Sequence, residues 1–219
     1  MRAGETLRDR NNVEVALFPL EYMNISQGEY GTYSHMDTLA MDFLGWNQNG
    51  RVYRCPYYAP VSSRVVYHSS YYNVWQSLNE VITPTGKRYI NYVVMHDDNP
   101  YPLGTVKNQG ELIGHTGTNA GPSSTPLTGD HVHINTAYGL YQGWERKPSG
   151  KSQLINSSHI YDTFYVNDTV LIRTYGYSWK NYEGGVVPPP TPPIPPSYRT
   201  GTHFKFVLYG NYRKERNNG

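Results

Sequence analysis

Turn-forming residues interrupt this chain so often that long helices are excluded. Gly contributes 21 and Pro 16 of the 219 residues, together about 17% of the chain, against roughly 12% in average proteins. Both residues break helices and mark turns. A further 22 residues are Tyr, which favours strands and can pack its ring while its hydroxyl stays in water. The sequence therefore predicts a mainly β, loop-rich fold with little helix.

Several short segments carry the alternating or β-branched pattern of strands. The strongest is YINYVVMH at 89–96, and others are expected at 13–20, 39–44, 64–68, 111–115 and 131–137. Residues 69–88 show no clear period and are interpreted as an inserted loop. Residues 160–179 are expected to form a closing hairpin with its turn at Asn167 and Asp168. Together these segments predict an antiparallel sheet or sandwich.

A proline-rich segment, PPPTPPIPP at 188–196, divides the chain. It lacks most of the backbone donors that a sheet or helix needs, so an extended polyproline conformation is expected. We therefore predict a main domain at 1–187, a linker at 188–196 and a short tail or strand at 197–219.

Charge and cysteine content exclude several classes of protein. With 19 Lys and Arg against 17 Asp and Glu, the chain lacks the basic surface expected of a nucleic-acid binder. Cys55 is the single cysteine, so no disulfide joins two points of the chain. Neither a signal peptide nor a membrane-spanning apolar stretch is expected. We expect no nucleic-acid partner and no membrane partner.

A His-x-His pair carries the clearest chemical signal. His131 and His133 lie two residues apart in an expected strand, so their imidazoles project from one face about 7 Å apart. Upstream, His35 and Asp42 border another expected strand. Two imidazoles and one carboxylate suit Zn²⁺ and leave one coordination position open. Alone, a His-x-His pair is also typical of ordinary surface or core histidines.

The motifs around these residues, taken in order, resemble the M23 family of zinc metallopeptidases, of the LytM and lysostaphin type. The segments that carry the resemblance are SHMDTLAMDF at 34–43, APVSSRVV at 59–66, YVVMH at 92–96, VKNQGELIGHTGTNAG at 106–121 and GDHVH at 129–133. The resemblance covers about residues 30–137. It implies a β fold whose groove has zinc at its floor.

Carried over residue by residue, the resemblance implies that His35, Asp42 and His133 bind zinc. It further implies that His96 and His131 act as catalytic imidazoles that do not bind the metal. One departure concerns the first motif, where six residues separate His35 from Asp42 and the family often has three. Asp37 is the competing carboxylate, and Asp42 is preferred for its Ala-Met-Asp-Phe context.

The resemblance also implies a function, which we take as the leading hypothesis. The chain is expected to be a zinc-dependent endopeptidase that hydrolyses cross-bridges or stem peptides of bacterial peptidoglycan. Without an export signal it would reach the wall in a bacteriophage tail or after release at lysis, so phage tail proteins are expected partners. The alternatives are a degenerate M23 domain that binds wall peptide without cleaving it, and a structural component of the virion. An unrelated His-x-His barrel of the cupin kind is disfavoured because no Glu follows the pair before Glu145.

Overall fold

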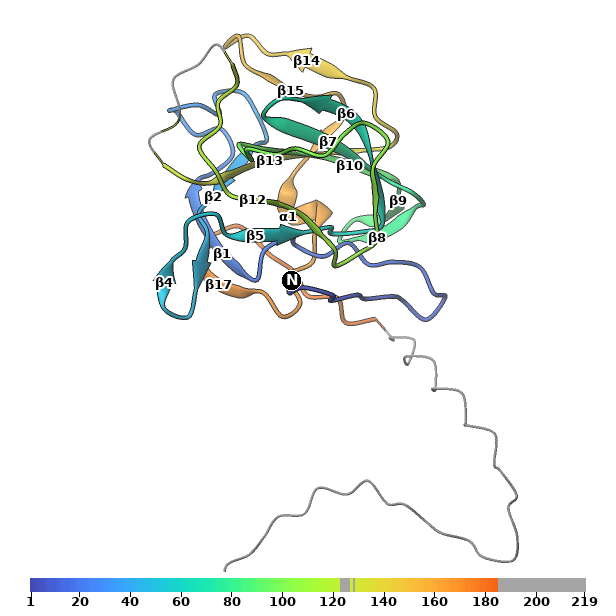
Figure 1. Ribbon diagram of the computed structural model, residues 1–219. Helices are drawn as coiled ribbons and strands as arrows, with labels where there is room; N and C mark the ends of the chain where they lie inside the picture. The colour runs from blue at the N-terminus through green and yellow to red at the C-terminus, as the bar shows by residue number, and fades with distance from the viewer. Residues whose placement is uncertain (123–126, 128, 185–219) are drawn as a thin grey trace, which may run out of the picture. The chain divides into compact units, whose positions relative to one another are not determined.

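The computed structural model describes residues 1–122, 127 and 129–184 (Figure 1). Within these residues strands dominate, and the one α-helix is the four-residue α1 (Ile160–Thr163). The prediction of a mainly β fold with little helix is confirmed. No helix in the described ranges has the length and apolarity needed to cross a membrane. The predicted linker 188–196 and tail 197–219 lie outside the described residues, so the division of the chain stays a prediction.

One large mixed sheet organises the described part of the chain (Figure 1). Neighbouring strands along it are antiparallel, except for the parallel pair that its last two strands form. Its strands, in spatial order, are β11 (Val106–Lys107), β6 (Ser63–Ser69), β7 (Tyr72–Ser77), β10 (Ile90–Met95), β13 (Val132–Tyr138), β2 (Met41–Phe43), β1 (Tyr22–Gln27) and β17 (Val170–Arg173), with β16 (Ser157–Ser158) paired to β13.

The other described strands form two-stranded sheets. These are β12 (Leu112–His115) with β5 (Pro56–Tyr58), β14 (Trp144–Arg146) with β15 (Ser152–Leu154), β3 (Trp46–Asn47) with β4 (Gly50–Arg51), and β8 (Val81–Thr83) with β9 (Gly86–Arg88). In the view of Figure 1, β14 and β15 lie above the large sheet, and β5 lies below it. The large sheet is thus covered on both faces.

The two faces of the large sheet bury different sets of side chains. Phe43, Val132 and Ile134 belong to the main core, which also holds Trp75 and Phe18. A smaller core on the opposite face contains four fully buried residues, Val74, Val93, Ala137 and Leu154. Because successive side chains alternate between faces, the residues next to Phe43 and Val132 in sequence point away from the main core. Asp42 and His133 are among them.

The interpretation of 69–88 as a loop is wrong. Residues 72–77 form β7, a central strand that pairs with both β6 and β10, and the hairpin of β8 and β9 follows. Both faces of β7 are buried, since Trp75 packs in the main core and Val74 in the smaller one. A strand buried on both sides loses the polar alternation by which a strand is recognised.

Two further strand expectations need correction. Residues 13–20 form only isolated bridges, such as Val15 with Ile82 and Leu17 with Tyr165, and the strand that opens the large sheet is β1. Residues 160–179 form no hairpin, because α1 occupies the start and β17 pairs in parallel with β1 instead. Tertiary pairing partners decided both outcomes.

Candidate metal centre

Adjacent strands bring two of the predicted ligands together. Asp42 on β2 and His133 on β13 are direct partners in the antiparallel register, flanked by the pair of Phe43 with Val132. Their side chains share the sheet face opposite the main core. His35 reaches the same point from the loop before β2, and its side chain is 1% exposed.

Three donor atoms converge at this point. His35 Nε2 lies 3.1 Å from Asp42 Oδ1 and 3.2 Å from His133 Nδ1, and Asp42 Oδ1 lies 3.0 Å from His133 Nδ1. A tetrahedral ion with bonds of about 2.05 Å separates its ligand atoms by roughly 3.3 Å. The three side chains therefore match one triangular face of a zinc site.

Hydrogen bonds and charge leave the three donor atoms, on His35, Asp42 and His133, with lone pairs that can bind a cation. His35 Nδ1 lies 3.1 Å from the Gly28 carbonyl oxygen, which can only accept, so Nδ1 carries the hydrogen and Nε2 of the neutral ring is free to bind a metal. Burial works to raise the pKa of Asp42, but the contacts with His133 and His35 hold that pKa well below its usual range. Burial lowers the pKa of His133. The donor set therefore fits a divalent ion such as zinc.

His96 and His131 stand beside the triangle with their rings 4.6 Å apart. His131 Nδ1 donates to the Gly129 carbonyl at 2.7 Å, and His96 Nδ1 donates to the Asn119 carbonyl at 2.8 Å. Each bond leaves Nε2 as the free ring nitrogen. His131 Nε2 lies 3.6 Å from Asp42 Oδ1. Burial, aided by the neighbouring histidines, lowers the pKa of His96 to about 3.

Two residues that the sequence interpretation missed hold this pair in place. Gly117 exchanges backbone hydrogen bonds of 3.0 Å with His131, and a Cβ on Gly117 would stand 2.1 Å from the His96 carbonyl oxygen. Asn119 donates its backbone N–H to the same oxygen, and its side chain donates to the backbone of Asp97 at 3.1 Å. His96 itself has a φ of 83°, which L-residues adopt only when the surroundings hold them there. In the sequence, the turn-forming residues of TGTNAG at 116–121 were the feature that could have indicated this role of Gly117 and Asn119.

The competing carboxylate and two other histidines lie elsewhere. Asp37 accepts a hydrogen bond from the Ser149 backbone at 3.0 Å and is not part of the triangle. His68 bonds to Asn73, and His159 contacts Glu29 at 2.6 Å.

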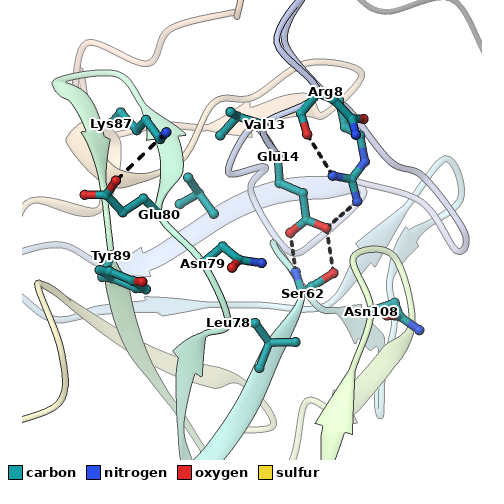
Figure 2. A pocket seen from close by; sticks show the side chains of 12 residues that line it. Arg8, Val13, Glu14, Ser62, Leu78, Asn79, Glu80, Lys87, Tyr89 and Asn108 are labelled. Carbon is teal, nitrogen blue, oxygen red and sulfur yellow. Dashed lines mark hydrogen bonds and ion pairs between the residues drawn. The ribbon is translucent and has the colours of Figure 1, made fainter.

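A separate cavity of about 490 Å³ is not lined by any of the five site residues. Figure 2 shows that the charged side chains lining this cavity pair with other lining residues. Glu14 accepts from Arg8 and from Ser62, and Lys87 faces Glu80 across 3.9 Å. The charged residues of this lining are thus paired with one another.

Over most of its own length, the chain is similar to a curated phage protein. It is 39% identical over 181 residues to Morphogenesis protein 1 of Bacillus phage B103, a match that covers 80% of this chain and 46% of that protein. The chain thus spans about half the length of this relative. No protein-family model matches the chain.

Solved structures give weaker similarities. A zinc-containing peptidase from Vibrio cholerae is 18% identical with a TM-score of 0.37, over 60% of this chain and 40% of that one. The M23 metalloprotease Pseudoalterin is 17% identical with a TM-score of 0.37, over 71% of this chain and 90% of that one. TM-scores below 0.5 do not define a common fold, so the residues themselves must carry the functional argument.

Proposed function

We propose that the chain is a zinc-dependent endopeptidase of the M23 type that hydrolyses stem or cross-bridge peptides of bacterial peptidoglycan. One observation carries the proposal. Three lone-pair donors, His35 Nε2, Asp42 Oδ1 and His133 Nδ1, converge within 3.2 Å of one another, and two further imidazoles stand beside them. A structural zinc site is closed by four protein ligands, whereas three ligands leave room for reactants.

The division of labour follows from the hydrogen bonds. His35, Asp42 and His133 would hold zinc, which when bound acidifies water and polarises a carbonyl group. His96 and His131 would manage protons, because each has Nδ1–H fixed to a backbone carbonyl and Nε2 free. Hydrolysis moves one proton from the attacking water to the leaving amine nitrogen. With its pKa of about 3, His96 is unprotonated at neutral pH and begins the reaction as an acceptor.

A phage setting is part of the proposal. The relative in Bacillus phage B103 is named a morphogenesis protein, so we place the chain in or on the virion, with phage tail proteins as partners and the host wall as substrate. That name also favours a second candidate, a virion component that uses the domain for assembly and not for hydrolysis. The presence of all five expected side chains in one cluster favours the enzyme.

Zinc content and hydrolysis, measured on the same variants, test the proposal. Purified protein should hold one zinc per chain and release peptide fragments from muropeptides. His133→Ala should lose both zinc and activity. His96→Ala and His131→Ala should keep zinc and lose at least about a hundredfold in turnover, the scale of removing a general acid or base.

The outcomes separate the alternatives. Zinc without hydrolysis of any muropeptide would favour a binding or assembly role. Failure to bind stoichiometric zinc after reconstitution would overturn the site. Loss of zinc from His131→Ala together with its retention in His35→Ala would mean that the roles are misassigned.

A further inference from the structure

A recess of about 270 Å³ lies next to the candidate metal centre. Its walls are residues 27–29 and 31–33 on one side and Tyr175 and Tyr177 on the other. None of the five site residues lines it, so it is a feature that the proposed hydrolysis does not use.

The recess shares a wall with the metal centre. Gln27 on β1 is the register partner of Asp42 on β2, and its side-chain amide contacts Ser34 Oγ at 3.0 Å. The Gly28 carbonyl accepts the hydrogen bond that orients His35. A molecule in the recess would therefore lie against the segment that positions a metal ligand.

Aromatic rings of the recess are held in place by other side chains. Tyr177 stacks on Tyr161 at 5.2 Å, and Tyr161 stacks on His159 at 4.8 Å, both pairs within 18° of parallel. The Glu29 carboxylate fixes His159 in turn. Because one face of Tyr177 is already packed, the ring can meet a ligand without rearranging.

Two more tyrosines complete the aromatic lining. Tyr175 donates its hydroxyl to the Ser26 carbonyl at 2.9 Å and carries the Arg173 guanidinium over its ring at 4.7 Å. Tyr33 is 90% exposed, an unusual position for a large ring that lines a recess. The recess thus offers one ring fixed by stacking, a second fixed by a hydrogen bond and a third free at its edge.

The charge of the lining restricts the ligand. Glu29 is the only charged residue among those that line the recess, and its side chain is 2% exposed and bonded to His159. The cation beside this lining is Arg173, whose guanidinium is held over the Tyr175 ring and donates to the Tyr175 hydroxyl. The lining itself therefore offers neither a cation to a phosphate nor a free carboxylate to an ammonium group. Hydroxyl, amide and aromatic groups suit a neutral polar molecule with an apolar face. A pyranose ring is such a molecule, because its C–H face can stack on an aromatic ring while its hydroxyl and acetamido groups form hydrogen bonds.

We propose that this recess binds an N-acetylated sugar of a glycan strand. The inference rests on the proposed function, since peptidoglycan carries such sugars beside the peptides that would be cleaved. A sugar held at Tyr33 and Tyr177 would direct the attached peptide toward His35 and its neighbours. Binding at the recess would favour wall-linked peptide over free peptide.

Chemical-shift mapping with the tetramer of N-acetylglucosamine tests this directly. The probe is added to the full chain labelled with ¹⁵N, with zinc and after its removal. Amide signals of Gly28, Gly31 and Thr32 should shift and saturate. Tyr33→Ala should weaken binding about fivefold, the scale of one aromatic contact, and Thr32→Trp should fill the recess and abolish binding. Tyr53→Ala is the matched control, since Tyr53 is 70% exposed and lies outside the recess.

Each outcome has a distinct meaning. The sugar site is overturned if no saturable shift is seen. It is also overturned if Tyr33→Ala and Thr32→Trp both bind the sugar as tightly as the wild-type protein does. Shifts at the same amides with a stem peptide but not with the sugar overturn it in favour of a peptide subsite. Because binding is measured without turnover, sugar binding by a protein that hydrolyses nothing would refute the proposed function and leave the sugar site standing.

Discussion

Adding one methyl group at Gly117 is expected to disable the proposed catalytic pair, His96 and His131, without loss of zinc binding. The new Cβ would stand 2.1 Å from the His96 carbonyl oxygen, whereas an ordinary contact of this kind needs about 3.4 Å. The His96 backbone must therefore move by roughly 1 Å, and its ring moves with it. A misplacement of about 1 Å can cost a hundredfold in rate, so Gly117→Ala should lose about that factor.

Gly117→Ala should also lower the free energy of unfolding. Overpacking a fitted site costs typically about 1–3 kcal/mol, and no backbone strain is added, because Gly117 has no positive φ. Gly139→Ala is the matched control. Gly139 has a φ of +85° with nothing within 4 Å of its Cβ position, so alanine there costs roughly 1–2 kcal/mol through left-handed strain alone and leaves the histidines untouched.

The assay combines three measurements on both variants. These are kcat/KM on a soluble muropeptide, zinc by elemental analysis and the free energy of unfolding by denaturant. We expect both variants to keep zinc and to lose similar stability, with only Gly117→Ala losing turnover. Wild-type turnover in Gly117→Ala, or an equal loss in Gly139→Ala, would refute the link between this glycine and the position of His96.

Three further predictions address the ligand choice, acid stability and the tail. Asp42→Ala should abolish zinc binding and Asp37→Ala should retain it; the reverse result in a zinc titration would restore Asp37 as the ligand. Asp9 accepts backbone hydrogen bonds of 2.9 and 2.8 Å, and although burial opposes the change these bonds lower its pKa. A lowered folded-state pKa adds stability above the unfolded value near 3.8, and that stability is lost as pH falls through the folded value. Asp9→Asn should therefore unfold more easily than wild type at pH 7, and the difference in urea titrations should shrink as the pH falls below 3.8. Truncation after Val187 should leave turnover of a soluble peptide unchanged, because all five proposed site residues precede it; lost turnover in a folded truncated protein would contradict the predicted domain division.

Local sequence was most informative where a strand is a run of β-branched, aromatic and other apolar residues. The segments 89–96 and 131–137 were predicted as strands; β10 lies within the first, and β13 ends at Tyr138, one residue past the second. Residues 72–77 gave no such signal, because β7 buries the polar Asn73 and Gln76 among apolar residues and packs Trp75 on one face and Val74 on the other. For such a strand the pattern of polar and apolar residues carries no alternation.

For the site, the sequence identified the types of the donor groups and the two histidines that share one face. Spacing by two places His131 and His133 on one sheet face in any strand, and the order of motifs suggested His35, Asp42 and His96 as their companions. Only the tertiary structure decided that Asp42 and not Asp37 faces them, because this choice depends on the register of β2 against β13.

The orientation of each histidine ring likewise depends on contacts between residues far apart in the sequence. His35 and His96 take their orientation from the carbonyls of Gly28 and Asn119, and Gly117 sets the distance between two segments of backbone. Sequence patterns report which residues share a face within one element. They do not report which distant backbone atom comes to rest beside a given ring nitrogen, because that contact depends on how separate elements pack.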